Sequence, residues 1–148
     1  MKTKVPFLLH LLAGLFLVNS LVHFLGVFQA IRSWNWLQVM DYQPGPIYAV
    51  FKNAALGLGF LDAAILLWMR LDWAPRLDGI IVITSALWFW LDRLVLTRNP
   101  LPFIDHLLPL LLTLLVLAFC LLSLESLKPF MRTAARRQAL LENEIMNE

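Results

Sequence analysis

Polar side chains recur at one depth in three long apolar segments of the chain. His23 lies about 10 Å from the end of the first segment that is predicted to face outward, at ~1.5 Å of rise per helical residue. By the same count, Lys52 and Asp92 each lie about 9 Å from the outer ends of their segments. Polar groups within a membrane span usually face the helix bundle and often serve function. We therefore predict an outward-facing ligand-binding pocket, whose remaining members are Asn19, Asn53, Trp88 and Arg93.

Two interpretations of this outer polar layer stay open. In the first, the layer binds a lipid headgroup, a quinone-like ring or a small polar ligand. In the second, Lys52 and Asp92 carry opposite charges and only tie two helices together, while Lys52 and Arg93 extend towards the membrane interface. Residue types and depths do not separate the two interpretations.

A second polar pair lies nearer the inner face. Asp62 sits about 10 Å from the inner end of its segment by the same rise, and His10 has a similar inner depth. A carboxylate and an imidazole at one depth are candidates for a proton relay. The alternative is a structural role, in which Asp62 is hydrogen-bonded to Thr84 or Ser85.

The two polar layers are separated by an apolar gap. Leu56, Leu58 and Leu87 are expected to fill it. A transporter needs a continuous polar path between the two faces, so this gap favours a plugged bundle with one external pocket.

Cofactor and catalytic motifs give little support to an enzyme. His23 and His106 differ in depth by about two turns, which disfavours a shared haem with two axial histidines. The single cysteine, Cys120, excludes a disulfide within the chain and a cysteine-based zinc site. We predict no catalytic residue, no metal and no resident cofactor, although a lipid or quinone would suit the outer pocket.

The composition is that of a membrane protein. Hydrophobic residues make up 60% of the 148 residues and charged residues 15%, whereas soluble domains are about half apolar and a quarter charged. Four apolar runs are each close to the ~20 residues that cross a bilayer, and only helices can do so without closing into a barrel. We predict an all-α, up-down four-helix transmembrane bundle over residues 1–127, with helices at about 6–30, 46–69, 79–97 and 104–124.

Helix caps and basic residues set the connections and the orientation. Asp78 is predicted to cap the third helix and Asp105 the fourth. Lys and Arg gather in cytoplasmic loops, so both termini are predicted to be cytoplasmic, in the cell (inner or plasma) membrane. Residues 128–148 are predicted to form a cytoplasmic tail with a short amphipathic helix whose basic half meets lipid phosphates. The basic residues on the inner side are Lys2, Lys4, Arg70, Arg76, Lys128, Arg132, Arg136 and Arg137, against Arg32 and Arg98 outside.

From the second predicted helix onward, over about two thirds of its length, the chain resembles small bacterial four-helix membrane proteins of the DoxX-like kind. The chain departs from that pattern because Asp92 stands where relatives carry a small residue, and because its last helix has no Glu before Glu125. The resemblance implies a compact up-down bundle and says little about activity. The matching pieces are Lys52-Asn53 followed by Gly57 and Gly59, then Asp92-Arg93 and the Arg98-Asn99-Pro100 loop.

The sequence thus favours a small non-enzymatic membrane protein. It would be an accessory or structural subunit, or a bundle that binds an amphiphile in its outer pocket. The alternatives are a small oligomeric transporter or channel, and a membrane enzyme that acts on a lipid or quinone. The expected partners are membrane lipids and either further copies of the chain or a larger membrane complex. The net charge of +2 is small and the basic residues cluster at the ends of apolar runs, so nucleic acid is not expected.

Overall fold

The computed structural model describes the backbone of residues 7–39, 45–96 and 104–146, and no strand occurs among these residues. Three helices are long and apolar enough to cross a membrane: α1, α3 and the part of α5 up to Thr133. The shorter α4 has 18 residues and contains Arg76 and Asp78. The elements are α1 (Phe7–Arg32), α2 (Trp34–Val39), α3 (Pro46–Met69), α4 (Ala74–Leu91), the π-helical turn η1 (Asp92–Leu96) and α5 (Ile104–Met146).

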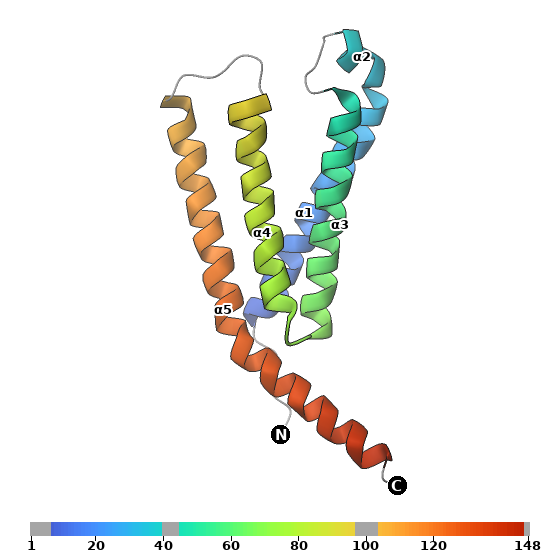
Figure 1. Ribbon diagram of the computed structural model, residues 1–148, viewed down its shortest axis with the longest axis vertical. Helices are drawn as coiled ribbons and strands as arrows, with labels where there is room; N and C mark the ends of the chain where they lie inside the picture. Colours follow the sequence, from blue (N-terminus) through green and yellow to red (C-terminus); the bar gives the residue numbers. More distant parts are fainter. Residues whose placement is uncertain (1–6, 40–44, 97–103, 147–148) are drawn as a thin grey trace.

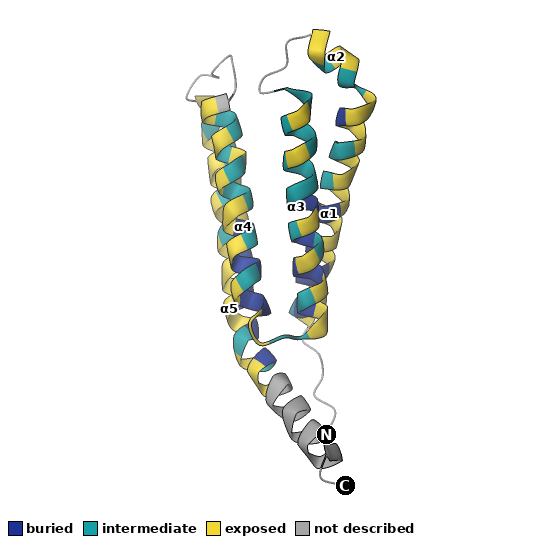
Figure 2. Ribbon diagram, turned by 45° about the vertical axis from the view of Figure 1, so that its right-hand side comes forward, coloured by how far each residue is buried: buried dark blue, intermediate teal, exposed yellow. Residues whose placement is uncertain are grey.

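The four long helices form two antiparallel pairs. Helix α1 packs along α3, and α4 packs along α5 (Figure 1). The pairs meet at the end where α3 passes into α4, which we call the closed end. They diverge towards the opposite end, which we call the open end (Figure 2). The start of α1 and the lower half of α5 both lie at the closed end, so the chain enters and leaves the bundle on the same side.

An apolar core seals the closed end. Phe16 of α1, Leu67 of α3 and Met131 of α5 are each at most 2% exposed. Dispersion contacts of such close-packed side chains are individually small but add up over a core. Helix association in a membrane relies on this kind of packing, because lipid tails are as apolar as the side chains themselves. The core also contains Leu9, Leu12, Ala13, Phe60, Ala63, Ala64, Ala74, Val82, Cys120, Leu124 and Leu127.

Small residues let α1 and α3 approach closely. The hydroxyl of Ser20 donates a hydrogen bond to the carbonyl oxygen of Gly57 across the pair, at 2.8 Å. A Cβ added at Gly57 would lie 3.3 Å from the ring of Phe24, and one added at Gly26 would lie 2.9 Å from the amide of Asn53. Glycines at such contacts permit a backbone separation that larger residues would prevent.

The connection between α3 and α4 is shorter than the sequence predicted. Helix α4 begins at Ala74 instead of residue 79, with Trp73 as its N-cap, so the prediction that Asp78 caps this helix is wrong. Pro75 is accommodated in the first turn, where a missing N–H costs nothing. The chain reverses over few residues because Arg70 takes a left-handed conformation, with φ of 57°, and its N–H bonds back to α3.

Asp78 is instead a buried residue of α4. Its side chain is fully buried, and neither carboxyl oxygen has a hydrogen-bond partner among the described residues. Asp105 likewise does not precede its helix but lies in the first turn of α5. There its carboxylate is near the helix N-terminus, where negative charge is favourable.

Helix α5 continues well past the expected end near residue 124. It runs as one helix to Met146, through Pro129, and changes direction in its lower half (Figure 1). Leu127 and Met131 are buried in the closed-end core. The start of the segment predicted as a separate tail helix is therefore continuous with the last bundle helix. The bend agrees with Pro129, which lacks one backbone donor. The amphipathic face predicted beyond residue 133 lies outside the residues whose side chains are described.

Two substitutions in α1 are expected to change stability in opposite directions. At Gly14 an added methyl group would meet nothing within 4 Å, so Gly14→Ala should stabilise the protein by about 0.5–1 kcal/mol through helix propensity. At Gly26 the methyl group would displace the Asn53 amide, so Gly26→Ala should destabilise it by about 1–3 kcal/mol. Thermal melts of both variants in one detergent check this. Stabilisation by Gly26→Ala would contradict the close approach of α1 to α3 at that position.

Candidate ligand-binding cavity

A cavity of about 770 Å³ lies between the two helix pairs, on the open-end side of the core. Helices α1, α3, α4 and α5 all contribute to its walls, together with the first residue of η1. Phe16, Phe60 and Val82 line it where it meets the closed-end core. Most of the lining is aliphatic or aromatic. The polar side chains of the lining are Asn19, His23, Lys52, Asn53, Ser85, Asp92 and Thr113.

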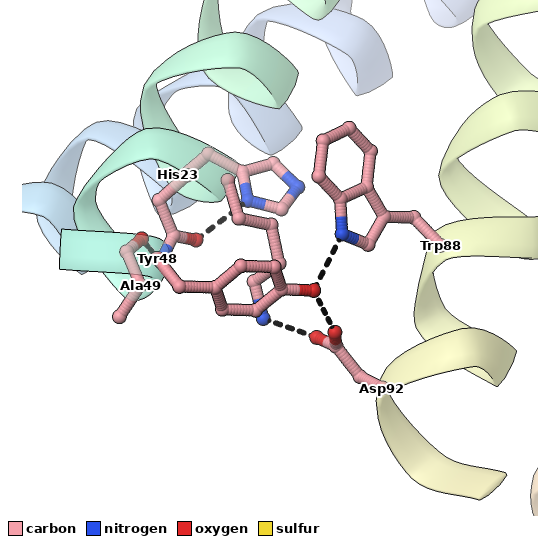
Figure 3. A network of polar contacts seen from close by, with 7 residues as sticks. His23, Tyr48, Ala49, Trp88 and Asp92 are labelled. Carbon is pink, nitrogen blue, oxygen red and sulfur yellow. Dashed lines mark hydrogen bonds and ion pairs between the residues drawn. The ribbon is translucent and has the colours of Figure 1, made fainter. Parts of the chain in front are cut away.

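A polar bridge joins α3 to the top of α4 at the open side of this cavity. The ammonium of Lys52 lies 2.5 Å from Oδ2 of Asp92. The hydroxyl of Tyr48 donates to Oδ1 of Asp92, and the indole N–H of Trp88 donates to that hydroxyl oxygen at 2.7 Å (Figure 3). The side chains of Lys52 and Asp92 are 22% and 25% exposed. The four residues Tyr48, Lys52, Trp88 and Asp92, which we call the α3–α4 bridge, therefore connect the pairs where their backbones have already separated.

The spacing of the bridge residues explains how it forms. Tyr48 and Lys52 are four residues apart on α3, and Trp88 and Asp92 are four residues apart along α4 and the start of η1. Residues at this spacing share one helix face. Two such faces from antiparallel helices meet at one depth. Lys52, Trp88 and Asp92 were predicted from the sequence as site residues, and Tyr48 was not. The spacing of Tyr48 from Lys52 is the signal that could have found it.

His23 is held in one orientation by Asn53. Its Nδ1 lies 3.0 Å from Oδ1 of Asn53, while the amide nitrogen of Asn53 donates to the carbonyl oxygen of Ala49 at 2.8 Å. The amide oxygen can only accept, so Nδ1 of His23 is the protonated nitrogen and Nε2 is left as an acceptor. The imidazole also stacks on the ring of Phe60, with centroids 5.8 Å apart and planes 5° from parallel.

Arg93 belongs to a different contact from the one predicted. Its Nε donates to Nδ1 of His106, and its Nη2 donates to the carbonyl oxygen of Asp105, both at 2.9 Å. The ring of Trp90 lies 6.3 Å from that of His106. Arg93 therefore ties η1 to the start of α5 and is absent from the cavity lining. Asp92 and Arg93 are adjacent in the π-helical turn, and they reach two different neighbouring helices.

The remaining predicted site residues are placed as follows. Asn19 lines the cavity, and its amide donates to the carbonyl oxygen of Leu15 at 3.0 Å. The inner pair is not brought together: His10 and Asp62 are both exposed, and no hydrogen bond or ion pair joins them in the described part of the chain. His10 instead contacts Trp68 edge-on, with ring centroids 6.4 Å apart. The expected alternative bonds from Asp62 to Thr84 or Ser85 are also not among the hydrogen bonds of the described residues.

The apolar gap beneath the outer polar layer has a different composition from the predicted one. Leu56 lines the cavity as expected, but Leu58 and Leu87 are 54% and 67% exposed, so their assignment to the gap is wrong. Phe16 and Phe60 close the interior instead, with ring centroids 5.8 Å apart. The separation of the cavity from the closed end is therefore made by aromatic packing between α1 and α3.

Comparisons with protein-family models, with curated proteins and with solved structures find no match to this chain. The resemblance to DoxX-like proteins thus stays a prediction. Within the described residues, no three His, Cys, Asp or Glu side chains are grouped so that they could hold a metal ion. Function must therefore be inferred from the cavity and the groups that line it.

The α3–α4 bridge predicts strong coupling between its charged members. Either Lys52→Ala or Asp92→Ala leaves a half-buried charge without the opposite charge of the ion pair, which costs more than removing both charges. Each single variant should melt at a lower temperature than the Lys52→Ala/Asp92→Ala double variant, with a coupling energy on the order of 1 kcal/mol. Thermal melts of the four proteins in one detergent give this value. Additive losses would show that the pair contributes nothing beyond its separate parts.

Proposed function

We propose that this chain is an integral membrane protein that holds one amphiphilic molecule in the cavity between its two helix pairs. The observation that carries the proposal is the distribution of chemistry over the cavity walls. His23, Lys52 and Asp92 gather towards the open end, while Phe16 and Phe60 line the part next to the core. Small-molecule sites are typically apolar with a few placed polar groups, and occupy roughly 300–1,000 Å³. A cavity of about 770 Å³ lies within that range.

The proposed arrangement in the bilayer has four spans. Helix α4 together with η1 forms the span that joins α3 to α5, which gives an up-down bundle. Arg70 and Arg76 lie at the connection between α3 and α4. Lys128 and Arg132 each follow a residue of α5 that is buried in the closed-end core, Leu127 and Met131 respectively. Because cytoplasmic loops are enriched in Lys and Arg, the closed end is proposed to face the cytoplasm, with both chain termini on that side. The cavity then opens in the outer half of the membrane.

The route into the cavity is proposed to lie between α1 and α5. Leu15 of α1 and Leu112 and Val116 of α5 line the cavity and are also 39%, 52% and 58% exposed. Side chains that face both the cavity and the outside mark an opening in its wall. This opening is lined by apolar groups, so an acyl chain can pass from the bilayer into the cavity without crossing water.

A binding protein agrees with the structure better than a transporter or channel does. The closed-end core, which includes Leu9, Leu12 and Met131, separates the cavity from that end of the bundle, and these side chains are at most 1% exposed. Asp78, the buried carboxyl of α4, is not among the described residues that line the cavity. We therefore propose an accessory membrane protein that binds an amphiphile, and place transport second.

Photo-crosslinking tests the cavity as the binding site. Diazirine-bearing hexadecanol and hexadecanoic acid would be used separately in phosphatidylcholine nanodiscs, and labelled residues mapped by mass spectrometry. Label is expected on Leu112 and Val116 for at least one probe. Ala86→Phe should reduce it, because Ala86 lines the cavity. The matched control is Leu87→Phe, since the neighbouring Leu87 is 67% exposed and does not line the cavity.

Two outcomes of the crosslinking experiment would contradict the proposal. The cavity residues could be labelled equally in the two variants, or label could be confined to outward-facing residues such as Leu111 and Leu115. Either outcome would mean that both probes contact only the lipid-facing surface. The cavity would then have no role in binding an amphiphile.

A further inference from the structure

We infer that the bound amphiphile is electrically neutral and carries a hydroxyl group, whose proton is accepted by Nε2 of His23. This inference rests on the proposed function and specifies its ligand. It follows from three properties of the cavity: the hydrogen-bonding state of His23, the pairing of the charged groups, and the available volume.

The first property is a hydrogen-bond acceptor fixed in place. Nδ1 of His23 is committed to Asn53, which is itself anchored on the backbone of Ala49. The second ring nitrogen points away from Asn53, towards the side of α4 that carries Trp88 (Figure 3). Stacking on Phe60 limits rotation of the ring. With the N–H at Nδ1 committed to Asn53, Nε2 offers a lone pair, which pairs with an O–H or N–H donor and not with another acceptor.

The second property is the balance of charge. Among the described residues that line the cavity, Lys52 is the only Lys or Arg, and its ammonium lies 2.5 Å from the Asp92 carboxylate. Arg93, which directly follows Asp92 in the sequence, does not line the cavity. It is bonded to His106 and to the backbone of Asp105. A phosphate or carboxylate headgroup would lie close to Asp92 and would have no cation of its own. Burying such an anion without a partner is costly.

The third property is size. The volume of about 770 Å³ lies within the roughly 300–1,000 Å³ that small-molecule sites occupy. A volume of this order suits a single chain or ring system with a small head, and not a two-chain phospholipid. Taken together, the walls select a single-chain, uncharged amphiphile whose head donates a hydrogen bond near the open end.

The test compares three competitors that share one acyl chain. They are 1-oleoylglycerol, its dimethyl ether, which has no hydroxyl, and 1-oleoyl-lysophosphatidylglycerol, which is anionic. Each is titrated against crosslinking of diazirine-bearing hexadecanol to the unaltered full-length protein in phosphatidylcholine nanodiscs. We expect 1-oleoylglycerol to displace the probe at a concentration at least about tenfold lower than the anionic lipid requires. The dimethyl ether should require about 3- to 10-fold more than 1-oleoylglycerol, the equivalent of one hydrogen bond.

A variant assigns the hydroxyl preference to one residue. His23→Phe retains a ring next to Phe60 and removes the acceptor, so 1-oleoylglycerol should lose its advantage over the dimethyl ether. His10→Phe is the control, because His10 lies outside the cavity lining and contacts Trp68. It should leave the order of the three competitors unchanged.

Each other outcome overturns a stated part. If the anionic lipid competes as well as 1-oleoylglycerol, the ligand is not restricted to neutral molecules, while the cavity retains its proposed function. If the ether competes equally, the hydroxyl is not recognised. If hexadecanoic acid labels the cavity and hexadecanol does not, the inference fails and the proposed function stands. If neither probe labels the cavity, both fail. The competitor order on the unaltered protein decides these points even if His23→Phe does not fold.

Discussion

The open half of this bundle depends on a polar contact between α3 and α4. In an apolar solvent, polar groups that lack a protein partner have no water to bond with instead, so they are expected to form hydrogen bonds between helices. The α3–α4 bridge concentrates four such groups at one depth, with the Lys52 ammonium 2.5 Å from Asp92. It connects the two helix pairs at a level where apolar packing no longer does. The cavity exists because the pairs are joined above it by this bridge and below it by the closed-end core.

The π-helical turn η1 makes the bridge compatible with a second contact. Asp92 opens this turn and faces α3, while Arg93 follows it and bonds to the start of α5. π-Helical turns are uncommon and are often found at functional sites. Here the turn lets consecutive residues serve two neighbouring helices. Because Arg93 is engaged by α5, Lys52 is the only Lys or Arg among the described residues that line the cavity, and it is paired with Asp92.

The sequence predicted helix type and depth better than it predicted helix faces. The second predicted helix, 46–69, coincides with α3. The predicted pairing of Lys52 with Asp92 is also confirmed, because the depth of a residue in a helix follows from its number and the rise per residue. Depth alone does not say which way a side chain points. His10 and Asp62 share a depth but do not meet, and Leu58 lies beside the buried Gly57 yet faces outward.

The misplaced start of the third predicted helix has a physical cause. Pro75 and Asp78 are typical of turns, so the sequence placed both before the third helix, whereas Pro75 fits a first helical turn and Asp78 is buried one turn further on. Tyr48 was missed because Tyr is common near membrane interfaces, so its position alone does not indicate a specific polar contact. Its role depends on Trp88 and Asp92, which are distant in sequence and become neighbours only when α3 and α4 pack.

The central claim is that an amphiphile occupies the cavity with its head at the open end. Nuclear Overhauser effects measured in nanodiscs of deuterated lipid test it directly. 1-Oleoylglycerol is the only protonated amphiphile, and the protein is deuterated except for its His residues and the methyl groups of Leu and Val. The claim predicts contacts from the acyl chain to the methyl groups of Leu56 and Val82, which are buried in the cavity wall, and from the glycerol protons to the His23 ring. Contacts limited to the outward-facing methyl groups of Leu58 and Leu87 would contradict it.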